Sequence, residues 1–288
     1  MAYLILIVVV LILFVSLFMT LHPAFGGSLN KRQKQAYGGF DNFANGKFVN
    51  PTPPEMDMSV KGLLSMLKDS LTGNRDRRPS GPIPVAPPDW DKIKSEEDSI
   101  TWFGHSAFLL SIDNKKLFVD PMLGRVASPV TFAGSKRYGN DLLRMIDDLP
   151  SLDAVLITHD HYDHLDYPSV IRLKHKVGHF FVPHGVGVHL ERWGVSREII
   201  TELNWWDEAT FQGITVALTP SKHFSGRGML NRDTTLWGGW VILGKTTRFY
   251  TSGDGGYDSH FEEIGKKYGP FDITCIEGGQ YDPRWPGV

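Results

Sequence analysis

The chain has 288 residues, of which 41% are apolar and 22% are charged, and its formal net charge is −2. This length suits one large domain or two small ones. The near-neutral balance gives no electrostatic reason to expect nucleic acid as a partner. The single cysteine, Cys275, excludes a disulfide framework and a four-cysteine zinc site.

The N-terminal segment is an apolar run over residues 2–21 that no charged residue interrupts. About 20 apolar residues suffice to cross the hydrocarbon core of a bilayer as a helix. A secretory signal peptide instead carries a basic segment before a shorter apolar stretch, and residues 24–26 offer only a weak cleavage site. We therefore expect residues 1–22 to form an uncleaved, single-pass membrane anchor.

Basic residues follow this run but do not precede it, namely Lys31, Arg32 and Lys34. Positive charge beside a membrane span favours the cytoplasmic side. The sequence therefore predicts that the catalytic domain lies in the cytoplasm.

Residues 23–98 read as a linker and lead-in, because proline and glycine interrupt them repeatedly. One stretch within them has helical periodicity, with apolar residues at Val60, Leu63, Leu64, Leu67 and Leu71. We expect one amphipathic helix there. Two interpretations are open: the helix packs on the main domain, or it lies on the bilayer surface beside the anchor.

The remaining residues, 99–288, form the expected catalytic domain. Short β-type runs occur at 107–112, 116–119, 154–157, 179–182, 214–218, 240–243, 248–251 and 273–276. Helix-like stretches lie between some of them, at 141–147, 167–174, 186–193 and 260–268. This alternation predicts an α/β (α+β) domain in which helices cover the faces of sheets.

The strongest chemical motif follows the apolar run 154–157. There the chain reads His159-Asp160-His161-Tyr162-Asp163-His164. In an extended segment, residues two apart point to the same side, so His159 and His161 are expected to bind one metal together. Asp163 and His164 come after the chain turns and are expected to reach a second metal. Imidazole and carboxylate suit zinc, and also iron or manganese.

Such a site needs ligands from distant parts of the sequence. His223 follows one apolar run, and Asp254 follows another within Gly253-Asp254-Gly255-Gly256. A carboxylate between glycines can bridge two cations, because no bulky side chain blocks their approach. Taken alone, such a histidine is more often a surface or core residue, and Gly-Asp-Gly is more often a turn.

The six-residue motif resembles the HxHxDH signature of the metallo-β-lactamase superfamily. Further segments are similar to its branch of N-acylphosphatidylethanolamine-hydrolysing phospholipases D. They lie at 101–105, 119–121, 158–167, 202–206, 236–238, 261–265 and 281–285. The resemblance runs from about residue 25 to the end. It implies an αββα sandwich with a dinuclear metal site, here preceded by a transmembrane helix.

The resemblance also implies roles for individual residues. The first metal is assigned to His159, His161 and His223, and the second to Asp163 and His164, with Asp254 as the bridge. Asp163 and Asp254 are then also the catalytic carboxylates, which hold the metals and orient a bridging hydroxide. Asp120 and His105 are expected to support these ligands from behind, although Asp120 is equally well read as a simple turn residue.

The sequence departs from the family pattern after 281–285, where a further histidine would complete the shell of the second metal. The printed sequence ends at Val288 without it. We therefore expect two Zn²⁺ ions with an incomplete second site, or a sequence that lacks the C-terminal end of the domain.

The leading functional hypothesis is a zinc-dependent phosphoric diester hydrolase that acts on an N-acylated membrane phospholipid. Fold similarity does not establish the substrate, because one fold hosts many chemistries. The alternatives are a hydrolase of a soluble lactone or small cyclic phosphodiester, and a membrane-tethered metal-binding protein with weak or no catalysis. Several tryptophans either line an acyl groove or pack in the core, as is more usual: Trp205, Trp206, Trp237 and Trp240.

Overall fold

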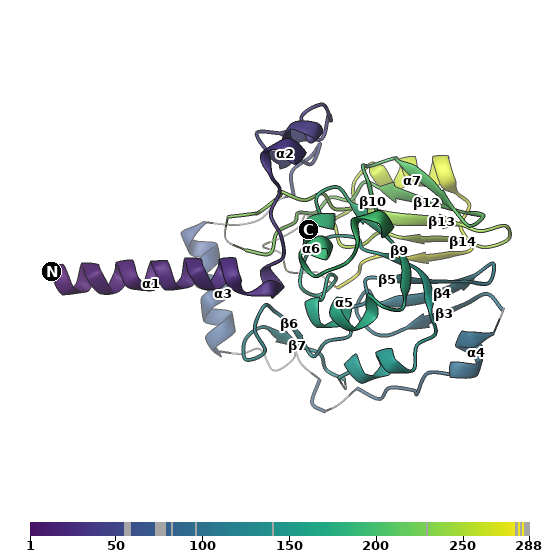
Figure 1. Cartoon of the computed structure of the whole chain (residues 1–288), viewed down its shortest axis with the longest axis horizontal. Helices are drawn as coiled ribbons and strands as arrows, with labels where there is room; N and C mark the ends of the chain where they lie inside the picture. Colours follow the sequence, from purple (N-terminus) through teal and green to yellow (C-terminus); the bar gives the residue numbers. More distant parts are fainter. Residues whose placement is uncertain are drawn as a thin grey trace.

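The structure is a computed structural model. It describes residues 1–54, 59–72, 79–81, 83–95, 97–139, 141–228, 230–279, 282 and 284. Most of the 281–285 segment named above lies outside the described residues. The C-terminal two-thirds of the chain forms a layered domain, and one long N-terminal helix projects from it (Figure 1).

The first sheet has six strands in the order β10-β9-β8-β5-β4-β3. They span Ser99–Trp102 (β3), Phe108–Ile112 (β4), Lys115–Val119 (β5), Leu152–Leu156 (β8), Val177–Pro183 (β9) and Ile200–Leu203 (β10). Strands β5, β8, β9 and β10 are parallel, whereas β3, β4 and β5 pair antiparallel. β8 is central and its residues are almost all buried, which explains why its sequence is a continuous apolar run.

The second sheet has five strands in the order β11-β12-β13-β14-β15. They span Glu208–Phe211 (β11), Ile214–Thr219 (β12), Gly239–Leu243 (β13), Arg248–Thr251 (β14) and Ile273–Cys275 (β15). The first four are antiparallel neighbours, and β15 pairs parallel with β14. Both sheets therefore contain parallel and antiparallel pairs.

Three clusters of buried hydrophobic residues fill the space between the layers. The central cluster joins the two sheets and includes Leu117, Leu156, Val216 and Trp240. A second lies between the first sheet and the helices Tyr167–Leu173 (α5) and Gly187–Arg192 (α6). A third lies between the second sheet and His260–Tyr268 (α7). The order of layers is thus helices, sheet, sheet and helix (Figure 1).

Shorter elements complete the domain. They are a hairpin of Val126–Ala127 (β6) and Ser135–Lys136 (β7), two 3-10 helices at Leu143–Asp147 (η3) and Arg197–Ile199 (η4), and the helix Trp90–Lys94 (α4). The stretch expected as helical over 141–147 is therefore a short 3-10 helix. Pro150 follows it closely, and proline disfavours helical conformation in the residue before it.

The lead-in contains more structure than its proline content suggests. It comprises Pro23–Phe25 (η1), Lys31–Tyr37 (α2), the hairpin of Phe43–Ala44 (β1) and Lys47–Phe48 (β2), and Val60–Thr72 (α3). Tyr37 and Phe48 are buried in the central cluster between the sheets. Part of residues 23–98 therefore belongs to the core of the domain rather than to a free linker.

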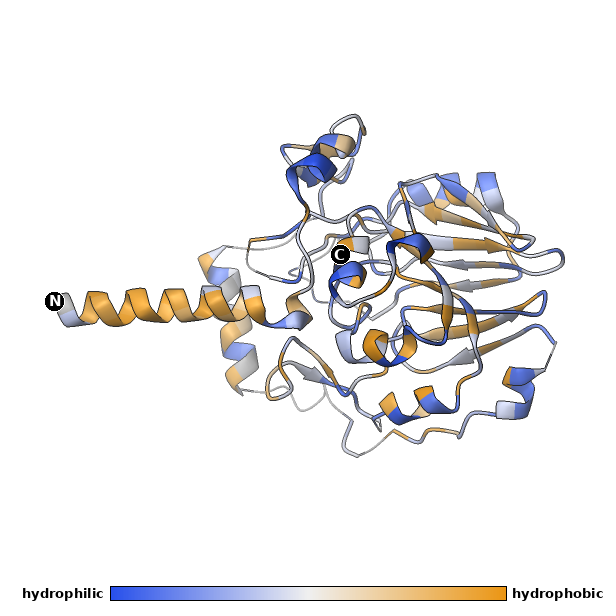
Figure 2. Cartoon of the chain, in the orientation of Figure 1, coloured by the Kyte–Doolittle hydropathy of each residue, from blue (hydrophilic) through white to orange (hydrophobic). Residues whose placement is uncertain are grey.

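Helix α1, Ala2–Leu21, is long and apolar enough to cross a membrane. The helix is hydrophobic along most of its length (Figure 2), and most of its large apolar residues are exposed rather than buried in the core. Length and composition allow two readings, a membrane anchor or a signal sequence.

Helix α3 exposes its apolar stripe. The exposed fractions of Val60, Leu64, Leu67 and Leu71 are 74%, 60%, 55% and 78%, while the side chain of Leu63 lies outside the described part. The structure therefore does not pack this stripe on the main domain, contrary to the first of the two interpretations. The axis of α3 runs across that of α1 (Figures 1 and 2).

Candidate metal centre

The predicted ligands meet at one rim of the sandwich, where strands from both sheets end. His159 follows the end of β8, His223 follows β12, and Asp254 follows β14. Two hydrogen bonds join the end of β8 to the start of β13 in the other sheet, from Gly238 N to Thr158 O (3.0 Å) and from Trp240 Nε1 to Ile157 O (2.9 Å). The two sheets thus fix the distances between residues far apart in the sequence.

The first cluster consists of three imidazoles, those of His159, His161 and His223. His161 Nδ1 lies 2.8 Å from His159 Nε2 and 3.3 Å from His223 Nε2. A tetrahedral zinc ion with bonds of about 2.0–2.2 Å holds its ligand atoms about 3.3–3.5 Å apart. The separation between His161 and His223 fits this range, and that between His159 and His161 is shorter. The three nitrogens lie close enough together to hold a single ion.

The electrostatics of this cluster favour neutral imidazoles. Burial and the neighbouring imidazoles, that of His164 first, lower the pKa of His159 well below its usual range. Burial and His161 lower the pKa of His223 to about 3, and burial lowers that of His161. Near neutral pH all three side chains therefore carry the lone pairs that a metal ion needs.

The second cluster consists of His105, Asp163, His164 and Asp254. His164 Nε2 lies 3.1 Å from Asp254 Oδ2 and 3.2 Å from His105 Nε2, which in turn lies 3.3 Å from Asp163 Oδ2. Burial lowers the pKa of His164, but the carboxylates of Asp254 and Asp120 outweigh it and raise that pKa well above its usual range. The same negative charge favours a cation at this position.

Asp120 supports the second cluster from beneath. This carboxylate is fully buried, and its Oδ2 accepts a hydrogen bond from His164 Nδ1 at 2.7 Å. Thr158 donates to it from both its backbone N–H and its hydroxyl. A carboxylate that holds the far nitrogen of a histidine fixes the orientation and tautomer of a metal ligand. Asp120 is thus more than a turn residue, since it links the end of β5 to the motif.

Close packing explains why glycines flank Asp254. A Cβ on Gly253 would lie 2.8 Å from Gly238 O and 3.0 Å from the Thr158 side chain, and one on Gly255 would lie 2.2 Å from Ser221 Oγ. Both glycines have positive φ angles, +59° and +150°. Gly253 therefore lets the Asp254 loop approach Thr158, beside the histidine motif, and Gly255 lets it approach Ser221, two residues before His223.

Sequence reasoning missed the residues that hold the metal loop in place. Asp160, inside the motif, accepts hydrogen bonds from Gly226 N (2.7 Å), Thr235 Oγ1 (2.9 Å) and His189 Nε2 (3.3 Å). Burial raises the pKa of Asp160, but the hydrogen bond from His189 and the nearby positive charges hold it well below its usual value. Asp160, His189, Gly226 and Thr235 follow no regular spacing in the sequence, so no sequence pattern indicated this network.

Arg227 is the largest of these unforeseen contributors, and it is fully buried. Its Nη1 donates to Asp160 O (2.6 Å) and Leu165 O (2.8 Å), while Nε and Nη2 donate to Ala24 O (2.9 and 2.7 Å). The guanidinium also stacks over the ring of Tyr162, 4.1 Å from its centroid. One side chain therefore connects the metal loop with the residues just after α1.

The tryptophans singled out in the sequence serve mainly as core residues. Trp237 and Trp240 are fully buried in the central cluster, and Trp205 packs against it. Trp237 Nε1 also donates to Ser221 O at 2.9 Å, two residues before His223. Together with the bond from Trp240 to Ile157, this contact fixes the strand ends that carry the histidines.

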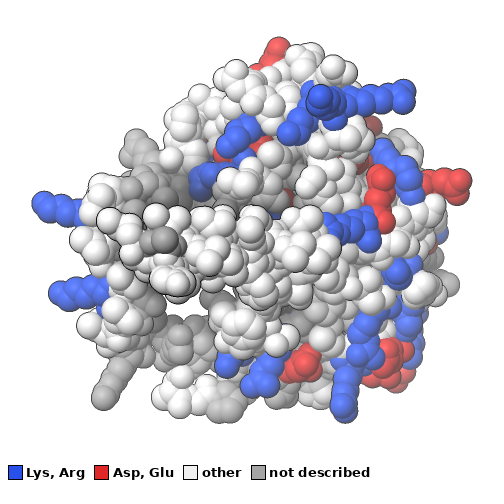
Figure 3. Space-filling model, turned by 60° about the vertical axis from the view of Figure 1, so that its left-hand side comes forward, with Lys and Arg blue, Asp and Glu red and all other residues white. Residues whose placement is uncertain are grey.

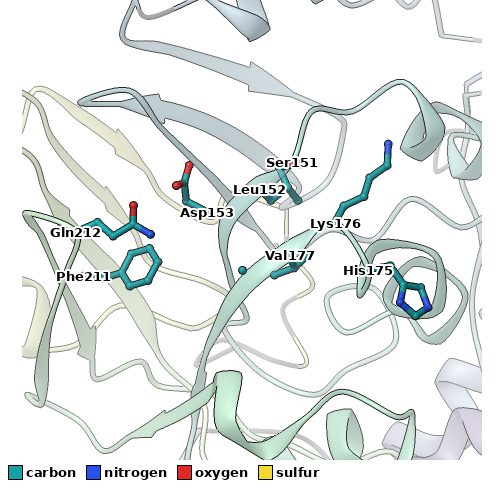
Figure 4. Close-up of a pocket in the computed structure, with 9 residues that line it drawn as sticks. Ser151, Leu152, Asp153, His175, Lys176, Val177, Phe211 and Gln212 are labelled. Carbon is teal, nitrogen blue, oxygen red and sulfur yellow. The ribbon is translucent and has the colours of Figure 1, made fainter.

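A cavity of about 440 Å³ lies at the opposite end of the strands (Figure 4). It is lined by residues at the starts of β8 and β9, among them Asp153 and Lys176, by Phe211 at the end of β11, and by Gln212. The histidines follow the carboxyl end of β8, whereas this cavity lies at its amino end. It is therefore not part of the metal centre.

Comparison with known families agrees with this geometry. The model of the beta-lactamase superfamily domain matches residues 115–287, which include both clusters except His105. His and Asp groups arranged as two adjacent clusters are typical of a binuclear metal site.

Three relatives indicate the breadth of the similarity. An uncharacterised protein of Mycobacterium tuberculosis is 39% identical over 86% of this chain and 66% of its own length. The N-acyl-phosphatidylethanolamine-hydrolyzing phospholipase D 1 of Caenorhabditis elegans is 38% identical over 64% of this chain and 54% of its own length. A metal-dependent hydrolase of Saccharolobus solfataricus is 30% identical over 63% of this chain and 72% of its own length. The chain thus spans less than two thirds of the first two relatives.

Proposed function

The chain belongs to the metallo-β-lactamase superfamily of metal-dependent hydrolases, and from this premise we propose that it cleaves a phosphodiester bond in an N-acylated membrane phospholipid. The observation that carries the proposal is the pair of His and Asp clusters at one rim, beside the base of an apolar N-terminal helix. The name of the nematode relative supplies the substrate class.

Each part of the chain has a separate task in this scheme. His159, His161 and His223 would hold one divalent cation, and Asp163, His164 and Asp254 the other. Two such cations, for which zinc is proposed and iron or manganese are alternatives, would supply Lewis acidity that activates water and offsets negative charge on the phosphate oxygens. The buried network behind them keeps the ligands oriented, so little reorganisation is needed during the reaction.

The base of α1 supports retention of the N-terminal helix as an anchor. Arg192 donates to Thr20 O (2.6 Å) and Gly26 O (2.6 Å), and Trp193 Nε1 donates to Pro23 O (2.7 Å). With the bonds from Arg227 to Ala24, these contacts make residues 20–26 part of the fold. Cleavage within 24–26 would remove the carbonyls that satisfy buried arginine donors, which is costly.

The same contacts support a position of the metal centre near the proposed membrane surface. Arg227 binds both Ala24 O, just after α1, and Asp160 O, within the metal loop. Lys and Arg side chains surround the face from which α1 projects (Figure 3). A phospholipid would thus reach the catalytic rim while most of it stays in the bilayer. The basic residues after α1, among them Lys31 and Lys34, support a cytoplasmic placement of the domain.

Helix α3 is proposed to lie on the bilayer surface with its exposed leucines in the lipid. In a Cys275→Ser background, we expect an environment-sensitive fluorophore on Leu67→Cys to shift to shorter wavelength when the full chain enters nanodiscs. The matched control is Ser65→Cys, on the opposite side of the helix, where no shift is expected. Equal emission from the two positions in nanodiscs would contradict this placement.

The decisive experiment for the proposed function is a lipid assay of the chain in nanodiscs that contain N-acylphosphatidylethanolamine. We expect release of phosphatidic acid that a chelator abolishes and added Zn²⁺ restores. A soluble phosphodiester and a lactone are tested in parallel. Cleavage of only a soluble substrate would favour a small-metabolite hydrolase, and bound metal without any turnover would favour a tethered metal-binding protein.

A further inference from the structure

We propose that His105 is a direct ligand of the second metal ion, completing a four-donor site with Asp163, His164 and Asp254. The proposal rests on the metal-dependent hydrolase function, because it assumes that the second cluster binds a cation. It goes beyond the sequence-based expectation that His105 merely supports other ligands. The family model begins at residue 115, so that match does not include His105.

The distances around His105 fit a ligand. Its Nε2 lies 3.2 Å from His164 Nε2 and 3.3 Å from Asp163 Oδ2. These values are close to the distance of about 3.3 Å expected between two ligand atoms of a tetrahedral zinc site with N and O ligands. All four donor atoms of the cluster lie within 4.8 Å of one another. His105 therefore occupies a ligand position rather than a place behind one.

The orientation of His164 also fits a shared cation. Its Nδ1 lies 2.7 Å from Asp120 Oδ2, and this contact fixes the ring from the buried side. Its Nε2 lies 3.1 Å from Asp254 Oδ2 and 3.2 Å from His105 Nε2. A metal ion among these three atoms would contact all of them together.

The backbone at His105 is shaped to present this ring. His105 has a φ angle of +48°, which is rare for a residue other than glycine, and Gly104 before it has φ +93°. Trp102 Nε1 donates to His105 O at 2.7 Å and holds this turn between β3 and β4. Strained conformations of this kind persist mainly at functional sites. The turn thus directs the imidazole toward the second cluster.

The solvent exposure of the ligand side chains indicates from which side a substrate would reach the second cluster. The side chains of His105 and Asp163 are 45% and 42% exposed, whereas that of His164 is fully buried. His105 therefore lies on the open side of the second cluster. A metal ligand there would also border the space in which substrate binds.

The test is metal binding to the full chain without substrate. We expect the unmodified chain to take up two equivalents of Co²⁺, with His105→Ala and His105→Gly retaining the first but binding the second at least about 100-fold more weakly, since even loss of an outer-shell partner costs about 10- to 100-fold. The visible spectrum of the second Co²⁺ should change in both variants. Free imidazole should restore it in His105→Gly, which also tolerates the positive φ angle.

The matched control is His175→Ala, an exposed histidine at the far end of the strands, for which both equivalents and the spectrum should be unchanged. Unaltered affinity and spectrum for the second Co²⁺ in both His105 variants would overturn the proposal. Because no substrate is present, this result is independent of the lipid assay. A chain that binds two Co²⁺ ions through His105 but cleaves no lipid would refute only the proposed substrate.

Discussion

Replacement of His161 by alanine is expected to abolish hydrolysis and to remove bound metal from the first cluster. His161 Nδ1 is central in that cluster, 2.8 Å from His159 Nε2 and 3.3 Å from His223 Nε2. Two imidazoles alone leave the ion with an incomplete set of protein ligands. We expect activity to fall by more than about 100-fold, because even an outer-shell change costs about 10- to 100-fold in metal affinity or activity.

Metal content and turnover should be measured on the same preparations of the His161→Ala variant. His175→Ala is again the control, because it removes an exposed imidazole remote from the site. Near-ultraviolet circular dichroism should confirm that the variant keeps its tertiary structure. Turnover equal to that of the unmodified chain would refute a reaction that depends on the first metal.

Replacement of Arg227 by methionine is expected to lower the free energy of unfolding by about 3–5 kcal/mol, because each buried acceptor left without a donor costs about 1–3 kcal/mol. The substitution keeps much of the volume but leaves the carbonyls of Ala24, Asp160 and Leu165 without these donors. For a chain of this size, we expect the melting temperature to fall by roughly 10 °C.

Thermal unfolding in detergent, followed by circular dichroism, measures this effect. Arg144→Met is the control, since Arg144 is exposed on η3 and its replacement should change the melting temperature little. Metal affinity should fall together with stability in Arg227→Met, because the guanidinium fixes the carbonyls of the metal loop. An unchanged melting temperature would show that the N-terminal segment and the metal loop are not held together by this residue.

The histidine motif was recognisable from the sequence because its geometry is local. His159 and His161 are two residues apart in the loop just after an apolar strand, and their ring nitrogens lie 2.8 Å apart. Helix α7 was predicted with the bounds that the structure gives, His260–Tyr268. Acidic residues in its first turn, lysines in its last turn and the following Gly-Pro all mark a helix with clear ends.

Short edge strands and the lead-in were less predictable. β11 has only four residues, and pairing with β12 rather than any apolar run of its own makes it a strand. Proline-rich sequence suggested a linker over 23–98, yet Tyr37 and Phe48 pack between the sheets. Burial of this kind depends on which surface a segment meets, and that surface is built from distant parts of the chain.

The sequence by itself determined the class of chemistry, because strand and motif spacing are properties of neighbouring residues. Only the tertiary structure decided that His105 reaches His164 across 59 positions, and that Arg227 joins Ala24, 203 positions away, to the metal loop. Such contacts depend on how two sheets align their strand ends. That alignment is fixed by packing of the whole core, which no local pattern of residues encodes.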